Sequence, residues 1–212
     1  MTASEIIAKF ELYVDDTTEL SSSEELDLFN KVYQRVCDDR PWEILKKEAT
    51  GTMASTTTIT MPSDFGFFVD NYSYTDNSIS TQINARPVVV WITGSGAASP
   101  FQVVNWSDRK QYLNTNGVCY LDIASSLIRF PVAQSSGATY SLDYKAVPAV
   151  LAASESPIFP TRFHDIIYHG MCVDDMTIQL FDKARSYAGE NQAQYNSYLK
   201  QMALWNANLL LN

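Results

Sequence analysis

Two histidines and a cysteine in the C-terminal third are the residues best suited to chemistry. His164, His169 and Cys172 follow one another at helical spacing, and Asp165 precedes His169 by four residues on the same helical face. Such a row could hold a zinc ion, or His169 could activate Cys172 as a nucleophile. No second cluster supplies the remaining ligands, and a nucleophile in mid-helix would be badly placed for substrate. We therefore interpret both histidines as residues of the polar helix edge and Cys172 as a core residue.

Other catalytic motifs are missing from the sequence. It has no Gly-x-Ser-x-Gly, no phosphate-binding loop, no dinucleotide-binding glycine motif and no Cys-x-x-Cys pair. Gly94-Ser95-Gly96 is interpreted as a hairpin turn, and the acidic turn at 15–19 does not have the spacing of a calcium loop. We predict that the protein is not an enzyme, has no catalytic or metal site and needs no cofactor.

The four tryptophans could be stacking platforms for sugars or bases, but other roles explain them better. Trp42 is interpreted as a core residue, and Trp91 and Trp106 as strand residues. Trp205 belongs to an apolar C-terminal end at 205–212. An exposed apolar end marks a contact with another chain, whereas a covered one packs within its own subunit, and both interpretations stay open.

Helical periodicity at both ends of the chain predicts a bundle. Capping-box spacings precede helices at 2–14 and about 22–38, where Ser21/Glu24 and Ser22/Glu25 offer two overlapping boxes. Residues 159–212 predict two long helices, or one helix bent near Gly189. The predicted bundle core consists of Phe10, Phe29, Val36, Trp42, Phe163, Ile167, Met171, Phe181, Leu199 and Met202.

The segment between the helices is rich in Thr, Ser, Gly, Val and Tyr, which is typical of strands. Strands are predicted at 56–61, 65–74, 88–93, 118–123, 127–130 and 139–144, and Asn116-Gly117 indicates a hairpin. The predicted fold class is α+β: an antiparallel bundle of N- and C-terminal helices with an inserted antiparallel β domain, a barrel or a sandwich. The expected divisions are 1–48 for the N-terminal helices, 49–146 for the β domain, and 147–212 for a linker and the C-terminal helices.

Charge and cysteine usage limit the possible partners. The net charge is −9 and no Lys/Arg cluster is present, so the chain is poorly suited to gripping nucleic acid. No apolar run is long enough for a bilayer, and residues 1–5 do not resemble a secretory signal. Three cysteines far apart favour reduced thiols in a cytosolic product without membrane contact.

This layout resembles the head-to-tail adaptor, or connector, proteins of tailed bacteriophages, including the tail tubular protein A type. The resemblance covers most of the chain as an arrangement of helices around a β insertion, and the insertion matches least well. The motifs that carry it are the turn at 15–20 before a capped helix, Arg40-Pro41-Trp42, Met61-Pro62-Ser63-Asp64-Phe65, and Pro160-x-x-Phe163-His164-x-x-Ile167.

The resemblance implies a structural virion protein of the head-tail junction, or neck, made in the host cytoplasm. Such adaptors form a homo-oligomeric ring, commonly of twelve copies, that joins the portal protein at the capsid vertex to a tail or nozzle protein. DNA passes through the bore without specific binding. The C-terminal end would then be a portal or subunit interface, and the β insertion would face the tail. The candidate interface residues are Trp205, Leu209, Leu210 and Leu211.

Two other classes of function remain as alternatives. The aromatic, Thr-rich β segment is compatible with a virion receptor- or glycan-binding protein, or another interaction protein. The row of His164, His169 and Cys172 is compatible with a hydrolase or metalloprotein. Glycan arrays and metal analysis of the purified protein would distinguish these classes from an adaptor.

Overall fold

The structure is a computed structural model that describes residues 1–15, 19–40, 42–68, 88–93 and 99–209. The chain divides into two compact units. The helical unit comprises Met1–Ile44 and Pro148–Asn212, and the β unit comprises Leu45–Val147. The predicted α+β class is confirmed, because helices from both ends of the chain flank a β region that is mainly antiparallel.

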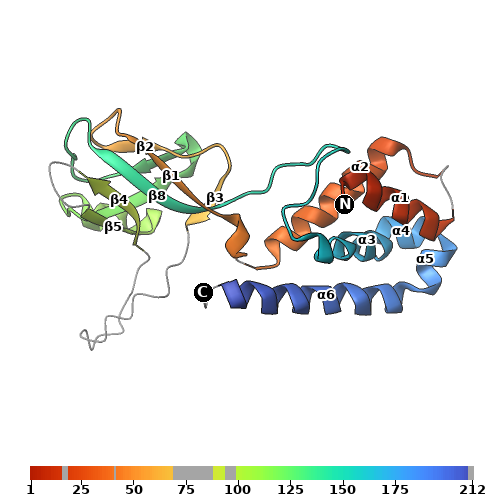
Figure 1. Cartoon of the computed structure of the whole chain (residues 1–212). Helices are drawn as coiled ribbons and strands as arrows, with labels where there is room; N and C mark the ends of the chain where they lie inside the picture. Colours follow the sequence, from red (N-terminus) through yellow and green to blue (C-terminus); the bar gives the residue numbers. More distant parts are fainter. Residues whose placement is uncertain (16–18, 41, 69–87, 94–98, 210–212) are drawn as a thin grey trace. The chain divides into compact units, whose positions relative to one another are not determined.

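The helical unit is built around a short central helix, α3 (Asp165–Cys172), against which α1, α2 and α6 all pack. In Figure 1, α6 runs alongside α3 as the longest helix of this unit. Among the described residues, the other helices of the unit are α1 (Ala3–Val14), α2 (Ser22–Asp38), η4 (Thr161–Phe163), α4 (Asp175–Leu180), α5 (Asp182–Ser186) and α6 (Ala188–Leu209).

Local capping sets the starts of the first two helices. The Thr2 side chain accepts from the Glu5 backbone N–H, and the Glu5 carboxylate accepts from the Thr2 N–H at 2.9 Å. Ser21 and Glu24 form the same reciprocal pair at the start of α2, so the first of the two overlapping boxes is the one used. Each box satisfies N–H groups that have no partner within the helix, which fixes the first residue of the helix.

The C-terminal pattern is more divided than predicted. The break expected near Gly189 lies two residues earlier, at Tyr187, where α5 ends and α6 begins, and two breaks that were not predicted lie near Val173 and Phe181. Asp174 leaves the helical conformation and caps α4 by accepting from the Met176 N–H. Phe181 has extended backbone angles and a buried ring, so burial of this side chain accompanies the second break.

The β unit forms one connected series of strands in the order β1-β8-β4-β5-β6-β7-β2, with β3 paired to β8. Its core comprises buried side chains from most of these strands, including Val90, Phe101, Ile128 and Leu142. The strands are β1 (Lys46–Thr52), β2 (Thr58–Thr60), β3 (Phe65–Phe68), β4 (Val88–Thr93), β5 (Ser99–Val103), β6 (Val118–Asp122), β7 (Leu127–Arg129) and β8 (Thr139–Ala146).

Three predictions about this unit need correction. Strands β1 and β5 were not predicted, and β5 pairs in parallel with β6, so the sheet is not purely antiparallel. Asn116-Gly117 forms a turn with a positive φ of 77° at Gly117, but it leads from η2 (Trp106–Tyr112) into β6 and is not a hairpin. Trp106 accordingly lies in the helical turn η2 and not in a strand. The predicted Gly94-Ser95-Gly96 turn lies outside the described residues.

Candidate interaction surfaces of the helical unit

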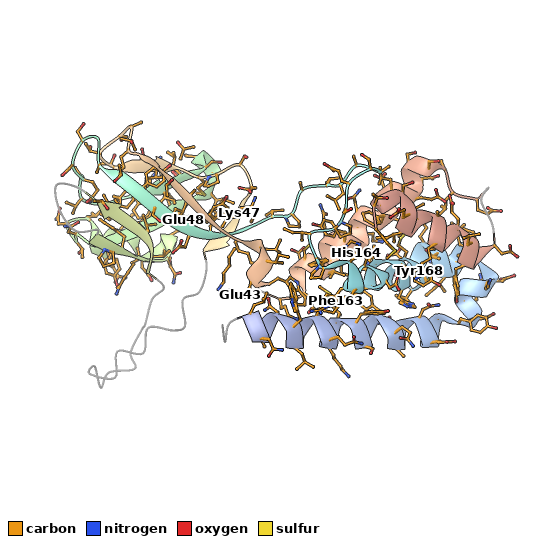
Figure 2. The ribbon with its side chains drawn as sticks, in the orientation of Figure 1. Glu43, Lys47, Glu48, Phe163, His164 and Tyr168 are labelled. Atoms are coloured by element: carbon orange, nitrogen blue, oxygen red, sulfur yellow. The ribbon has the colours of Figure 1, made fainter. Side chains whose placement is uncertain are left out.

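The histidine and cysteine row is built into the bundle, not into a cleft. His164 is buried, with its Nε2 2.8 Å from the Phe159 carbonyl oxygen, and burial lowers the pKa of its ring despite that hydrogen bond. Its position at the start of α3 is labelled in Figure 2. His169 contacts Asn191 through its Nδ1 at 2.9 Å. Cys172 is fully buried, and burial raises the pKa of its thiol to about 12, which leaves no thiolate nucleophile at neutral pH.

His164 therefore does not lie at a polar helix edge, because its ring is 2% exposed. In the part of the chain that the structure describes, no group of three His, Cys, Asp or Glu side chains is placed to hold a metal ion. Nothing in this geometry favours the hydrolase or metalloprotein alternative.

A buried carboxylate ties the C-terminal half of the helical unit to α2. Asp174 is 2% exposed and pairs with Lys31 at 2.8 Å and with Arg35 at 3.0 Å. Burial alone would raise the pKa of Asp174, but the hydrogen bonds from Lys31 and Arg35 outweigh it and lower the pKa below its ordinary value. Both cations of α2 are thus used to hold a carboxylate of their own subunit.

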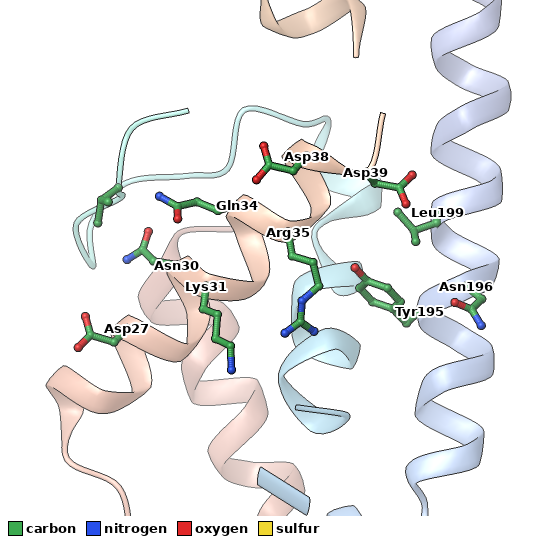
Figure 3. A pocket seen from close by; sticks show the side chains of 11 residues that line it. Asp27, Asn30, Lys31, Gln34, Arg35, Asp38, Asp39, Tyr195, Asn196 and Leu199 are labelled. Carbon is green, nitrogen blue, oxygen red and sulfur yellow. The ribbon is translucent and has the colours of Figure 1, made fainter. Parts of the chain in front are cut away.

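An open groove of about 920 Å³ lies between α2 and α6. Figure 3 shows Arg35 and Tyr195 pointing into it from α2 and α6. One rim carries Asp27 and Asp38, which are exposed and have no ion pair with any described residue. The remaining lining residues are Asn30, Lys31, Gln34, Asp39, Val150, Asn196 and Leu199.

The linker that follows the β unit forms part of the groove wall. Asn30 is buried and holds this linker, since its Nδ2 donates to the Leu151 carbonyl at 3.0 Å and its Oδ1 accepts from the Leu151 N–H at 2.8 Å. Val150, the next residue back, is left 66% exposed at the groove. The groove therefore combines a fixed apolar wall with an acidic rim.

The C-terminal end of α6 is partly anchored and partly exposed. Trp205 is partly exposed and packs on Phe163, with ring centroids 5.6 Å apart. Asn206 is buried, and its Oδ1 accepts from the Glu43 N–H at 2.7 Å. Leu209 is 43% exposed. The other two candidate interface residues, Leu210 and Leu211, lie outside the described residues.

A cation from η4 lies beside the flank of α6 that carries Trp205. The Arg162 guanidinium lies over the Phe163 ring, 4.8 Å from its centroid, and Arg162 has no ion pair with any described residue. Tyr198 is partly exposed on this flank and stacks on His169 with centroids 5.8 Å apart. Sequence periodicity did not single out Arg162, Asp27 or Asp38, because their significance comes from having no ion pair with any residue that the structure describes.

The residues assigned to the bundle core occupy the following places. Phe10, Phe29, Val36, Trp42, Phe163, Ile167, Met171, Phe181 and Met202 are all buried. Leu199 is only partly buried, because it lines the α2–α6 groove. Trp42 is also fixed by a hydrogen bond from its Nε1 to the Val36 carbonyl at 2.7 Å.

Charge is divided unequally between the two units. Residues 1–44 and 148–212 contain 17 acidic and 8 basic residues, so the helical unit carries the whole net charge of −9. Residues 45–147 contain 7 of each and have no net charge. Helix α6 is an exception within the acidic unit, since Glu190 and Lys200 are the charged residues among its 22.

One exposed aromatic cluster in the β unit bears on the glycan-binding alternative. Trp106 is 47% exposed, but the Arg109 guanidinium lies 3.9 Å from the centre of its ring and Tyr120 packs edge-on at 5.5 Å. A sugar stacks on an open ring face, and the guanidinium covers one face of this ring. The cluster instead has the Trp, Tyr and Arg composition typical of protein contacts.

Comparison with known proteins decides the class of the molecule. The family model described as SU10 adaptor protein matches residues 1–209. The chain belongs to the SU10 adaptor protein family. Membership in this family confirms the predicted relationship to phage head-to-tail adaptors and gives the chain a structural role as a bacteriophage adaptor protein. A search among curated proteins found no match to the chain. None of the helices in the described parts of this SU10 adaptor is long and apolar enough to span a membrane.

Proposed function

We propose that this protein forms a ring at the neck of the virion, where it joins the portal protein to a tail or nozzle protein and surrounds the path of the DNA. The single observation that carries the proposal is the family match over residues 1–209, which covers almost the whole chain. The resemblance sets the expected ring at twelve copies.

The charge of the helical unit supports a role next to DNA that must move. A net charge of −9 on this unit repels phosphate, so DNA in a bore lined by this unit would not be held by ion pairs. Two cations of this unit, Lys31 and Arg35, are already held by Asp174 within the subunit.

The C-terminal end is the proposed contact with the portal. Leu209 is 43% exposed at the end of α6, and the sequence continues with two further leucines. Because Trp205 and Asn206 are anchored to Phe163 and Glu43, a truncation must stop after them to leave the bundle intact.

Purified protein incubated with isolated portal rings tests the function. Full-length protein should bind as a closed ring by electron microscopy, and a chain ending at Asn208 should lose the binding while keeping its helical circular dichroism. Leu12→Ala, which changes another exposed leucine at 81% exposure, is the matched control and should bind normally. Absence of any portal complex with the full-length protein would reject the proposal.

A further inference from the structure

We propose that the subunit contact joins two different surfaces on the two flanks of α6. The first surface, called the Trp205 flank, is formed by Arg162, Tyr198 and Trp205. It docks into the α2–α6 groove of a second copy, where Arg162 meets Asp38. The inference rests on the proposed ring and adds which surfaces meet in it.

The helix itself separates these surfaces. Leu199 lines the groove and Trp205 lies six residues later, so their side chains point about 120° apart around the helix axis. A contact between two different surfaces of the same protein is heterologous, and repetition of such a contact closes a ring when the rotation permits. Surfaces on two different flanks of one helix suit that arrangement.

The charges of the two surfaces are complementary. Arg162 is a cation without an ion pair among the described residues, in a unit whose net charge is negative. Asp38 is exposed on the groove rim and likewise has no ion pair in the described chain. The groove cations, Lys31 and Arg35, are held by Asp174, so they repel an incoming cation less strongly.

The side-chain types also match those of subunit contacts. Trp, Tyr and Arg dominate the binding energy of protein interfaces, and the Trp205 flank offers one of each. The Phe163 ring beneath Arg162 and Trp205 holds both in place, at 4.8 Å from the guanidinium and 5.6 Å from the indole ring, so little side-chain freedom is lost on docking. On the other side, the exposed Val150 gives the groove an apolar wall.

Helix α6 has a composition suited to burial between copies. Interfaces are depleted in Lys and Glu, and two charged residues in 22 is a small number for a largely exposed helix. A helix that faced only water in an acidic unit would be under no such restriction. The small number of charges on α6 is therefore consistent with close neighbours on both sides.

Charge reversal of the full-length protein tests the pairing. Arg162→Asp alone should weaken self-association roughly tenfold or more by sedimentation velocity, and Asp38→Arg alone should do the same. Mixed in equal amounts, the two variants should assemble again in alternation, because each flank then meets a groove residue of opposite charge. The double variant R162D/D38R should also assemble. Glu19→Arg and Lys183→Asp, which change charge elsewhere on the helical unit, should leave assembly unchanged.

The outcomes separate this inference from the proposed function. Where rings form with wild-type protein and with both single variants, the ring stands and the assigned pairing is overturned. Where the single variants form rings but no longer bind the portal, the groove binds a portal segment and does not bind a second copy of this chain. Where wild-type protein forms no ring, alone or with the portal present, the proposed function fails first and the pairing with it.

Discussion

Gly170 is the position where the packing of the helical unit is least tolerant. It lies on α3, and α2 and α6 approach this helix from two sides. A Cβ atom at Gly170 would collide with Cγ1 of Val32 on α2 and would lie 3.0 Å from Cε2 and 3.3 Å from Cδ2 of Tyr195 on α6. Both neighbours are buried, so neither can move into solvent to make room.

The expected cost of Gly170→Ala follows from two opposing effects. Replacing a glycine inside a helix by alanine favours the helix by about 1 kcal/mol. Forcing an extra carbon into a packed core costs about 1–3 kcal/mol. Because one of the contacts is a direct collision, we expect the second effect to win and the variant to be less stable by about 1–2 kcal/mol. Urea unfolding followed by helical circular dichroism measures this difference.

Gly189→Ala is the matched control for this substitution. Gly189 lies in the first turn of α6, and nothing lies within 4 Å of the Cβ that alanine would add. The same chemical change should therefore stabilise the protein by up to about 1 kcal/mol. A stabilising effect of Gly170→Ala similar to that of Gly189→Ala would refute the packing argument. Val32→Ala combined with Gly170→Ala should cost less than the sum of the two single changes, because the smaller side chain removes the collision.

Two buried carboxyl groups should give opposite pH dependences. Burial, and then the neighbouring Glu11, raise the pKa of Glu25 from 4.5 to about 7, so the protonated form of Glu25 favours folding. Glu25→Gln should therefore stabilise the protein above about pH 7 and have little effect below pH 4.5. Unfolding midpoints measured over a series of pH values test this. Asp174 has a lowered pKa, so its contribution is present at neutral pH and is lost as the pH falls through the folded-state pKa. Asp174→Asn keeps a capping side chain but loses the ion pairs with Lys31 and Arg35. The free energy of unfolding should therefore fall by about 1–3 kcal/mol near neutral pH and converge with that of the wild type in acid. An equal loss at all pH values would contradict this.

The features that the sequence predicted well are those decided by neighbouring residues. The starts of α1 and α2 follow from side chains three residues away, Glu5 for Thr2 and Glu24 for Ser21, and the structure forms both pairs. The family resemblance was also accessible, because it rests on short motifs around prolines and aromatics that are visible in the sequence itself.

The division of the C-terminal helices was not accessible in the same way. Asp174 interrupts an otherwise helical pattern, and the partners that stabilise the carboxylate there are 143 and 139 residues away in sequence. No local periodicity reports such a distant ion pair, whereas the break at Tyr187 has a local sign in the sequence, the nearby Gly189.

The two unpredicted strands illustrate the same limit. Strand β1 reads Lys-Lys-Glu-Ala-Thr-Gly-Thr, which has little strand preference, and its conformation is set by pairing with β8 over its whole length. Strand β5 contains Pro100, which ordinarily argues against a strand, yet it pairs with both β4 and β6. In both strands tertiary pairing overrides local preference.

The distribution of charge connects these structural details to assembly. The proposed ring would bring together helical units of charge −9, and this repulsion would oppose assembly at low salt. Close approach is therefore easiest through a surface that carries few charges of its own, such as α6, and through a local pair of opposite charges, such as Arg162 with Asp38. The same acidity keeps the proposed bore from binding the DNA that must pass through it.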